Sequence, residues 1–298
     1  MILWGRPVAQ KIKEELKSFF GQSWLVGKKI KIFLFSEDSP SKVYVDLKRK
    51  FAQQVGLEAD IVYKPEIDSF DEAYNLINEA NQNSQVIWII IQLPLNKHLQ
   101  PFRSRLLTSV VPLKDIDWLG GVLFGLSQTG LFEFLPATPA AVIKILNFYN
   151  LDNFRWKKVL IIGQSGLVWA PLATYLLTKQ AEVVSVNEYM ALDQLIKFSK
   201  QADIIITATG QIHLVGERFV REDKSQIIID VGWGIKDGKA TWDVNIEKIK
   251  DKVKAYTPVP GGVGPVTVAS LFENIKIIQE YIRPIWSNLS YIENDLWV

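Results

Sequence analysis

The sequence predicts an α/β protein whose sheets are mainly parallel. Short apolar runs typical of buried strands alternate along the chain with amphipathic stretches of helical periodicity. The chain has 298 residues, enough for two domains of about 150 residues each. Its composition, 48% hydrophobic and 22% charged, is that of an ordinary globular protein. We therefore expect two α/β domains that follow one another along the chain.

The first half of the chain predicts three strands separated by helices. Each expected strand is an apolar run bounded by polar or turn-forming residues. The strands cover Lys29–Phe35, Asp60–Tyr63 and Gln85–Ile91, and helical patterns cover about 6–20, 40–55 and 69–82. A further helix is expected to about Tyr149, with Thr138 as its N-cap and Pro139 at its first helical position.

The second half predicts a nucleotide-binding domain. Strands are expected near 158–162, 182–187, 203–207 and 226–231, with helices around 167–179 and 190–200 and a last helix over roughly 266–283. The apolar run Val159–Ile162 leads into a turn that carries Gly163 and Gly166, and a helix follows. A glycine-bearing turn between a buried strand and a helix is where the pyrophosphate of a dinucleotide docks.

The composition excludes several classes of site and partner. The chain has no cysteine, which excludes disulfides, thiolate metal sites and cysteine nucleophiles. Its two histidines, His98 and His213, are too few for a histidine-rich metal site, and we expect both in loops or at the surface. A net charge of +2 with scattered lysines is not that of a nucleic-acid-binding protein. The longest apolar run is far short of the roughly 20 residues of a membrane helix, and no secretion signal is recognised, so we expect a cytoplasmic protein.

Three short motifs in the first half carry side chains suited to catalysis or ligand binding. Tyr44 and Lys48 are four residues apart and share one face of a helix, where a phenol and an ammonium form a proton-handling pair. Gln92 follows a buried strand, at the end where open α/β sheets bind ligands. Asp115 and Asp117 are suited to a cation or to a heterocycle rich in N–H donors. Taken singly, the motifs also fit a surface lysine packed over a tyrosine, a strand terminator and a solvated turn.

Taken together, these motifs resemble those of the bifunctional methylenetetrahydrofolate dehydrogenase/methenyltetrahydrofolate cyclohydrolase family. The resemblance extends over nearly the whole chain and includes the Pro-Ala-Thr-Pro stretch at 136–139 and the Gly-Gln-Ser turn at 163–165. Its most specific part is the octapeptide Pro258–Pro265, PVPGGVGP. It implies a catalytic, folate-binding α/β domain at 1–138, joined by 270–298 because the C-terminal helix returns to it. A Rossmann-like dinucleotide-binding domain would span 139–269, and the protein would be a homodimer.

The resemblance assigns roles to four residues in a folate cleft between the two domains. Lys48 would be the catalytic lysine of the cyclohydrolase step and would assist the attack of water on the methenyl carbon. Gln92 would hydrogen-bond Lys48 and help to set its protonation state. Tyr44 would stack on the folate ring system, and Asp117 would accept hydrogen bonds from the pterin N–H groups.

The resemblance also implies binding residues for the cofactor and further ones for the substrate. The dehydrogenase step passes a hydride directly from the substrate to a nicotinamide, so the protein mainly orients the two rings. NAD or NADP would be held by Gly163, Gln164, Ser165, Gly166, Glu188, Thr209 and Gly232. The substrate would also contact Pro260, Gly261 and Gly262, where the glycines allow a close approach of the backbone.

The cofactor loop departs from the family pattern Gly-Arg-Ser-x-x-Val-Gly-x-Pro. Gln164 replaces the arginine that typically helps to hold a 2′-phosphate, and Glu188 ends the next strand, where an acid bonds the ribose 2′-OH of NAD. Both changes favour NAD over NADP. Trp169 stands at the third small-residue position, where a glycine lets the helix pack close to the strand. Either the helix shifts and repacks around the indole, or the indole points toward the cofactor cleft, where it lines the site or blocks it.

Other tryptophans also occupy positions where the family has small or different residues. Trp118 follows Asp117 in place of a glycine, Trp233 lies in an altered Asp-Val-Gly-Ile-Asn stretch, and Trp242 precedes Asp243 in place of a glycine. Compensated repacking explains these changes, and so does a partial loss of cofactor binding. Three hypotheses follow: the bifunctional enzyme, which converts 5,10-methylene- through 5,10-methenyl- to 10-formyltetrahydrofolate; a cyclohydrolase alone; and a non-catalytic folate- or nucleotide-binding protein.

Overall fold

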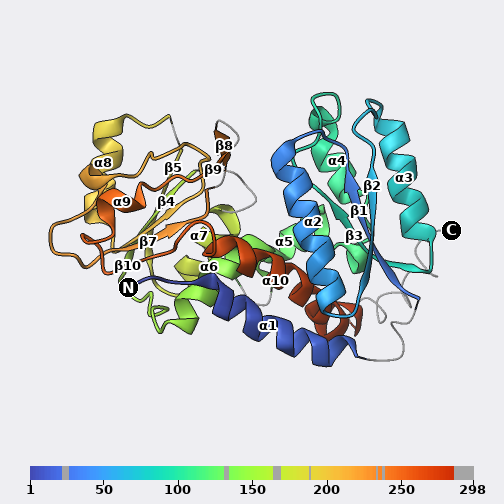
Figure 1. Ribbon diagram of the computed structural model, residues 1–298, viewed down its shortest axis with the longest axis horizontal. Helices are drawn as coiled ribbons and strands as arrows, with labels where there is room; N and C mark the ends of the chain where they lie inside the picture. Colours follow the sequence, from blue (N-terminus) through green and yellow to red (C-terminus); the bar gives the residue numbers. More distant parts are fainter. Residues whose placement is uncertain are drawn as a thin grey trace. The chain divides into compact units, whose positions relative to one another are not determined.

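The computed structural model describes residues 1–21, 27–130, 134–163, 169–187, 189–232, 234–236 and 239–284 (Figure 1). The chain forms two compact units, and each is described by itself. The first unit contains residues 1–11 and 125–270, and the second contains residues 12–124 and the chain from Leu271 onward. These bounds place residues 1–11 and 125–138 with the nucleotide-binding half, whereas the sequence analysis assigned them to the catalytic domain. The functional domain boundaries stay a prediction.

The second unit is built on a three-stranded parallel sheet in the order β2-β1-β3. All three predicted strands are confirmed, as β1 (Lys29–Leu34), β2 (Glu58–Tyr63) and β3 (Val86–Ile91). Helix α2 (Ser39–Gln54) packs on β1 and β2, and α3 (Phe70–Gln82) packs on β3 (Figure 1). The second unit also contains α4 (Arg103–Thr108), short 3₁₀ turns at Gln100–Phe102 and Pro112–Lys114, and parts of two helices that cross the division between the units, α1 (Gly5–Phe20) from residue 12 onward and α5 (Gly121–Ser127) up to residue 124.

The core of the second unit follows from the strand sequences. Strand β3 reads Val-Ile-Trp-Ile-Ile-Ile, and five of its six residues are buried. A strand that is apolar on both faces is typical of a parallel sheet covered by helices on both sides. The side chains of Phe33, Phe35, Ile77 and Ile89 belong to one buried cluster that joins the sheet to α3. Burial of these apolar side chains leaves the polar residues at the strand ends, where the candidate site lies.

The first unit is built on a five-stranded parallel sheet in the order β10-β7-β6-β4-β5. The predicted strands are confirmed as β4 (Lys158–Ile162), β5 (Glu182–Val186), β6 (Ile204–Thr207) and β7 (Ile227–Asp230); β10 (Ala255–Tyr256) was not predicted. Its helices are α6 (Ala137–Phe148), α7 (Trp169–Thr178), α8 (Leu192–Gln201) and α9 (Ile246–Ile249), and a β8 (Gly234–Lys236)–β9 (Lys239–Thr241) hairpin is added. The last helix, α10 (Val263–Ile277), continues as a π-helical turn over Ile278–Ile282. The strand order reverses beside β4, and such a reversal is where doubly wound sheets bind nucleotides.

One helix start differs from its prediction. Helix α6 begins at Ala137 with Pro136 as its N-cap, and no side chain caps it. The carbonyl of Pro136 already accepts a hydrogen bond from the Ala140 N–H at 2.9 Å, so Thr138 lies inside the first turn. Thr138 as the N-cap was therefore wrong, because the helical hydrogen bonding starts two residues earlier.

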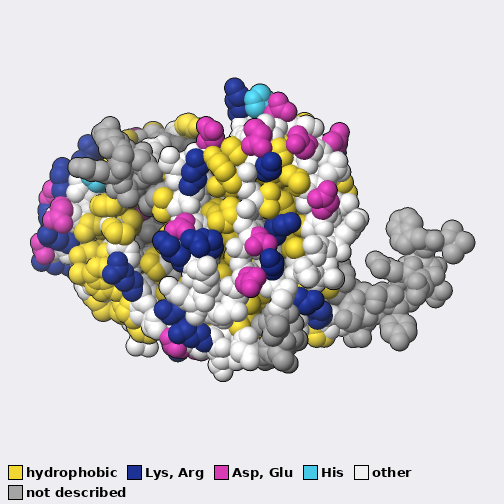
Figure 2. Space-filling model, turned by 45° about the vertical axis from the view of Figure 1, so that its right-hand side comes forward, with side chains coloured by type: hydrophobic (Ala, Val, Ile, Leu, Met, Phe, Trp, Pro, Cys, Tyr) yellow, Lys and Arg dark blue, Asp and Glu magenta, His cyan; other side chains and the backbone are white. Residues whose placement is uncertain are grey.

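The surface agrees with the even charge distribution of the sequence. The face drawn in Figure 2 mixes basic and acidic side chains and shows no continuous basic area. His98 and His213 are both exposed in turns, as expected. None of the described helices combines the length and the hydropathy that a membrane crossing requires.

Helix α2 carries Tyr44 and Lys48, and its first turn is capped by Asp38. The Asp38 carboxylate accepts hydrogen bonds from the Ser41 N–H at 2.8 Å and the Ser41 hydroxyl at 2.7 Å. The Ser41 hydroxyl also lies 3.2 Å from the carbonyl oxygen of Leu93, next to Gln92. The cap thus fixes the start of α2 beside the end of β3.

We predict that Asp38→Ala lowers the free energy of unfolding by about 1 kcal/mol, because it removes an N-cap acceptor. Urea unfolding measures the change. The matched control is Ser69→Ala, because Ser69 is the N-cap of α3 and makes no side-chain cap hydrogen bond. An equal loss in the two variants would contradict the assignment of the cap.

Candidate functional site

The centre of the candidate site is an ion pair between Lys48 and Asp117. The Lys48 Nζ lies 3.4 Å from Asp117 Oδ2, and the two side chains are only 11% and 17% exposed. Burying two charges is unfavourable unless they are paired, so this pair requires its two partners to be held in place. The Oδ1 atom of Asp117 has no hydrogen-bond partner within the described part of the chain. It is the oxygen of this carboxylate that is left to accept a bond from a ligand.

Tyr44 lies one helical turn before Lys48 on α2, as the spacing predicted. Its side chain is half-buried, and burial raises the pKa of the Tyr44 phenol above its ordinary value. The phenol therefore stays protonated at neutral pH and presents an O–H donor and an aromatic face beside the lysine.

Gln92 lies just beyond β3, but it does not hydrogen-bond Lys48. Its Nε2 donates to the Leu93 carbonyl at 2.7 Å, and its Oε1 is buried without a partner among the residues described. The expected Gln92–Lys48 hydrogen bond is therefore corrected: the ammonium pairs with Asp117 because a carboxylate offers a full negative charge. The orphaned Oε1 is a buried acceptor that a donor of the substrate, a water or a moved Lys48 would satisfy.

The loop that carries Asp117 is organised by Asp115, which the sequence analysis named as a candidate ligand-binding acid but to which the family resemblance gave no role. Asp115 is 4% exposed, and its two oxygens accept hydrogen bonds from the Trp118 N–H at 3.0 Å and the Gly120 N–H at 2.8 Å. Burial, with a smaller effect of the Asp117 charge, raises the pKa of Asp115 to about 7. Trp118 has a φ of +58° and a fully buried side chain, which explains why a glycine is the expected residue there. The signal for Asp115 was present in the sequence, where it stands two residues before Asp117 as the other acid of that motif.

On the cofactor side, Gly163 is described and fits a nucleotide loop. Its φ is +106°, and a Cβ at this position would lie 2.5 Å from the Ala208 carbonyl oxygen. Only glycine therefore fits at this position directly after β4. Thr209 is the second residue after β6 and lies close to Gly163. The other predicted loop residues, Gln164, Ser165 and Gly166, and the predicted Glu188 lie outside the described residues.

Gly232 lies against a buried acidic network. A Cβ at Gly232 would lie 2.1 Å from the carboxylate carbon of Asp243. The Asp243 Oδ2 accepts hydrogen bonds from the Thr207 hydroxyl at 2.6 Å and the Thr209 N–H at 2.7 Å. Burial, together with the Asp243 charge, raises the pKa of Asp230 to about 8. These acids tie the ends of β6 and β7 together, and neighbouring atoms of the chain already fill the space that a side chain at Gly163 or Gly232 would need.

Trp169 is the first residue of α7, and its side chain is half-buried. The helix therefore forms with an indole where the family pattern has a glycine. Whether the indole lines the cofactor site or blocks it stays a prediction.

The segment Pro260-Gly261-Gly262 makes a close approach within its own unit. The Val259–Pro260 peptide is cis, and Gly261 has a φ of +103°. The Gly5 N–H donates to the Gly261 carbonyl at 2.9 Å, and a Cβ at Gly262 would lie 2.4 Å from the Pro258 carbonyl oxygen. The chain's own folding thus requires these glycines, and their contact with the substrate stays a prediction.

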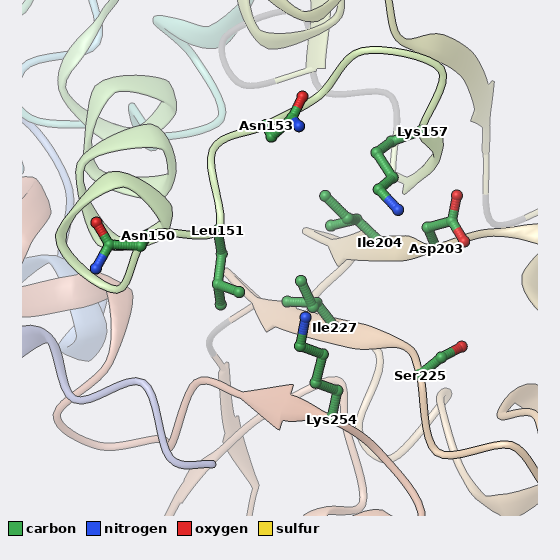
Figure 3. Close-up of a pocket in the computed structure, with 9 residues that line it drawn as sticks. All are labelled: Asn150, Leu151, Asn153, Lys157, Asp203, Ile204, Ser225, Ile227 and Lys254. Atoms are coloured by element: carbon green, nitrogen blue, oxygen red, sulfur yellow. The ribbon is translucent and has the colours of Figure 1, made fainter.

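A pocket of about 260 Å³ lies at the amino-terminal ends of the strands of the five-stranded sheet, whereas Gly163 lies at the carboxyl end of β4 (Figure 3). It is lined by Asn150, Leu151, Asn153, Lys157, Asp203, Ile204, Ser225, Ile227 and Lys254. Three of these residues come directly before a strand: Lys157 before β4, Asp203 before β6 and Lys254 before β10. None of the predicted site residues lines this pocket, so we do not assign the candidate catalytic site to it. Within the described residues, no three acids or histidines gather in an arrangement that would hold a metal ion.

Comparison with known proteins gives matches to two family domains. Residues 3–117 match the tetrahydrofolate dehydrogenase/cyclohydrolase catalytic domain, and residues 136–282 match the NAD(P)-binding domain of the same family. The Bifunctional protein FolD of Aquifex aeolicus (strain VF5) is 36% identical over 281 residues, which cover 92% of this chain and 93% of the relative.

Solved structures agree with this match. The FolD methylenetetrahydrofolate dehydrogenase/cyclohydrolase from Campylobacter jejuni is 33% identical, with a TM-score of 0.82 over 94% of this chain and 98% of the other. The methylenetetrahydrofolate dehydrogenase-cyclohydrolase from Trypanosoma brucei, solved with NADP and an inhibitor, is 26% identical, with a TM-score of 0.86 over 95% and 98% of the two chains.

The shifted carboxyl groups predict that the free energy of unfolding falls as the pH rises from about 4 to about 8. An unfolded aspartate loses its proton near pH 3.8, whereas folded Asp115 and Asp230 keep theirs up to about 7 and about 8. The folded state therefore binds more protons over this range, and each group lowers the stability by at most about 1.4 kcal/mol per pH unit. Urea unfolding at a series of pH values measures the slope.

Asp230→Asn should reduce this slope, because the amide does not titrate while it can still accept the Val244 N–H bond. The control is Asp193→Asn, an exposed acid in the first turn of α8, which should leave the slope unchanged. A native protein whose stability rises with pH over this range would contradict the prediction.

Proposed function

The chain belongs to the tetrahydrofolate dehydrogenase/cyclohydrolase family, and we propose that its buried Lys48–Asp117 pair carries the hydrolytic half of the reaction. The enzyme oxidises 5,10-methylenetetrahydrofolate to 5,10-methenyltetrahydrofolate with NAD(P) and hydrolyses the product to 10-formyltetrahydrofolate. The observation that supports the residue assignment is the nearly buried ion pair. Lys48 Nζ pairs with Asp117 Oδ2, and the Oδ1 atom of Asp117 is left to bind a ligand.

In the hydrolytic step, water adds to the methenyl carbon and gives up a proton. The bond from that carbon to N5 then breaks as the added hydroxyl loses its proton to become the formyl oxygen and N5 takes up a proton, which leaves the formyl group on N10 and an N–H at N5. Lys48 Nζ is the group that would hold or pass on the proton of the attacking water, since general acid–base catalysis needs a proton carrier at the reacting atom. The phenol of Tyr44 would orient the substrate ring from the same helix face, and the unpaired Oε1 of Gln92 would accept a hydrogen bond from Lys48 or water as the substrate binds.

Asp117 would orient the substrate through its free Oδ1. Its Oδ2 stays with Lys48, so one carboxylate would connect the pterin N–H donors to the proton carrier. In this arrangement substrate binding and hydrolysis would both depend on Asp117, because the carboxylate that binds the substrate would also position Lys48.

In the dehydrogenase step the residues of this chain bind and orient. Gly163, Thr209 and Gly232 would contact the nucleotide, and bound nicotinamide would supply the hydride acceptor. The residues Gln164, Ser165, Gly166 and Glu188 would complete the cofactor site, and Pro260, Gly261 and Gly262 would add substrate contacts. A homodimer and a cytoplasmic location are further expectations of the family resemblance.

We expect the native protein to reduce NAD or NADP with methylenetetrahydrofolate and to hydrolyse methenyltetrahydrofolate without a cofactor. The absorbance of the methenyl compound and of the reduced cofactor follows both steps. Hydrolysis alone would mean a cyclohydrolase that has lost the first step, and no reaction in either assay would mean a non-catalytic folate-binding protein.

Lys48→Met should reduce the hydrolysis rate by about 100-fold or more, because it removes the proton carrier. Lys50→Met is the matched control, since Lys50 lies on the same helix, is 59% exposed and pairs with Asp46 at the surface. Hydrolysis that persists in Lys48→Met at the native rate would show that the lysine is assigned wrongly.

We predict tighter binding of NAD than of NADP, because Gln164 lacks the charge that holds a 2′-phosphate and Glu188 repels it. Calorimetric titration with each dinucleotide measures the two affinities. Gln164→Arg should improve NADP binding relative to NAD, whereas Gln194→Arg, which adds the same charge on the exposed face of α8, should not. Tighter NADP binding by the native protein would overturn the preference.

A further inference from the structure

The position of Asp117 depends on a short loop that has little regular structure of its own. Asp117 follows the 3₁₀ turn Pro112–Lys114 and precedes helix α5, which begins at Gly121. No side chain other than Lys48 bonds the Asp117 carboxylate in the described residues, so the main chain of residues 115–120 must place it. What holds this main chain therefore decides whether the ion pair forms.

Asp115 holds the loop from the inside. Its carboxylate bridges the N–H groups of Trp118 and Gly120, which lie on the far side of Asp117 in the chain. A Cβ at Gly120 would lie 2.9 Å from Asp115 Oδ2 and 3.0 Å from the Leu107 carbonyl oxygen, so the loop closes tightly around this carboxylate. Buried carboxylates that accept backbone N–H bonds fix a loop in one conformation, because leaving those donors unpaired is costly.

Asn274 holds the same loop from helix α10. Its Nδ2 donates to the Ile116 carbonyl at 2.9 Å, and the residue is only 2% exposed. Asp115 itself forms an isolated parallel bridge with Ile89 of β3, so the loop is also tied to the sheet. The peptide groups on both sides of Asp117 are thus anchored to buried partners.

Trp118 makes these anchors necessary. A non-glycine residue at a φ of +58° is unfavourable by itself and persists where the surroundings hold it. The Asp115 bond to its N–H and the complete burial of its indole supply that support. In this chain the left-handed backbone conformation at position 118 is therefore held by the Asp115 hydrogen bond and the buried indole, whereas a glycine would adopt it without such support.

From this geometry we infer that Asp115 and Asn274 are positioning residues that hold Asp117 against Lys48 in the folate site. They act through Asp117 and touch no reacting atom, since both Asp115 oxygens and the Asn274 amide are bonded to the loop backbone. The inference rests on the proposed role of Asp117.

The test is a double-mutant cycle on methenyltetrahydrofolate hydrolysis and tetrahydrofolate binding, the latter followed by tryptophan fluorescence. Asp117→Asn, Asp115→Asn and Asn274→Leu are each measured alone, and the last two are also combined with Asp117→Asn. If Asp115 acts by positioning Asp117, Asp115→Asn and Asn274→Leu each lower kcat/KM or tetrahydrofolate affinity by about tenfold or more in the native background. In the Asp117→Asn background the same changes have less than about a twofold effect, because the group they position has already been altered.

Two controls separate positioning from general damage. Asp68→Asn removes an exposed acid of the same unit and should leave both measurements unchanged. Circular dichroism reports whether each variant is folded, and Asn274→Leu carries the test if Asp115→Asn does not fold, since it loosens the loop from the opposite side.

The outcomes distinguish this inference from the proposed function. Single and double changes that multiply, or anchor variants that behave like the native protein while Asp117→Asn is impaired, would overturn the positioning role and leave the role of Asp117 intact. A native-like Asp117→Asn would instead show that the proposed role of Asp117 is wrong, and the inference would fail with it.

Discussion

The ion pair between Lys48 and Asp117 is the interaction on which the site depends. Both charged side chains are largely buried, so each is energetically unfavourable unless the other lies close enough to form the ion pair. The two residues lie 69 positions apart in the chain, and neither belongs to the element that carries the other. The fold answers this requirement at both ends: Asp38 and Ser41 anchor the helix of Lys48 beside Leu93, and Asp115 and Asn274 anchor the loop of Asp117.

The same logic explains where this chain departs from its family pattern and where it does not. Gly163 and Gly232 remain glycine, and at both positions a Cβ would lie within 2.5 Å of a neighbouring atom. At position 118 the glycine of the pattern is a tryptophan, and the backbone keeps a positive φ while the indole enters the core. Positions where a side chain would collide with the chain therefore retain glycine, whereas a position that needs only a left-handed backbone accepts tryptophan once buried contacts stabilise it.

Buried carboxyls serve as internal connectors in both units. Asp115 joins two backbone N–H groups of one loop, and Asp243 joins the Thr207 hydroxyl to the Thr209 N–H at the end of β6. Asp230 lies beside Asp243, and burial raises its pKa to about 8. A carboxyl in such a place either stays protonated or must be surrounded by donors, and both routes restrict the loops around it to one geometry. The loops at the candidate sites are thus held by polar bonds in the interior, although they contain little regular secondary structure.

The sequence by itself determined the α/β class, the main strands and helices, the shared face of Tyr44 and Lys48 and the position of Gly163 directly after β4, because periodicity, turn residues and four-residue spacing act within a short window of chain. The family resemblance joined Tyr44 and Lys48 with Gln92 and Asp117 in one candidate site. Only the tertiary structure decided that Lys48 pairs with Asp117 while Gln92 turns to the Leu93 carbonyl, that Asp115 is buried as a loop anchor, and that α6 starts before Thr138. Each of these depends on which partners come within hydrogen-bond reach after the sheet has formed, and that is set by strand order and burial rather than by the neighbouring residues in the chain.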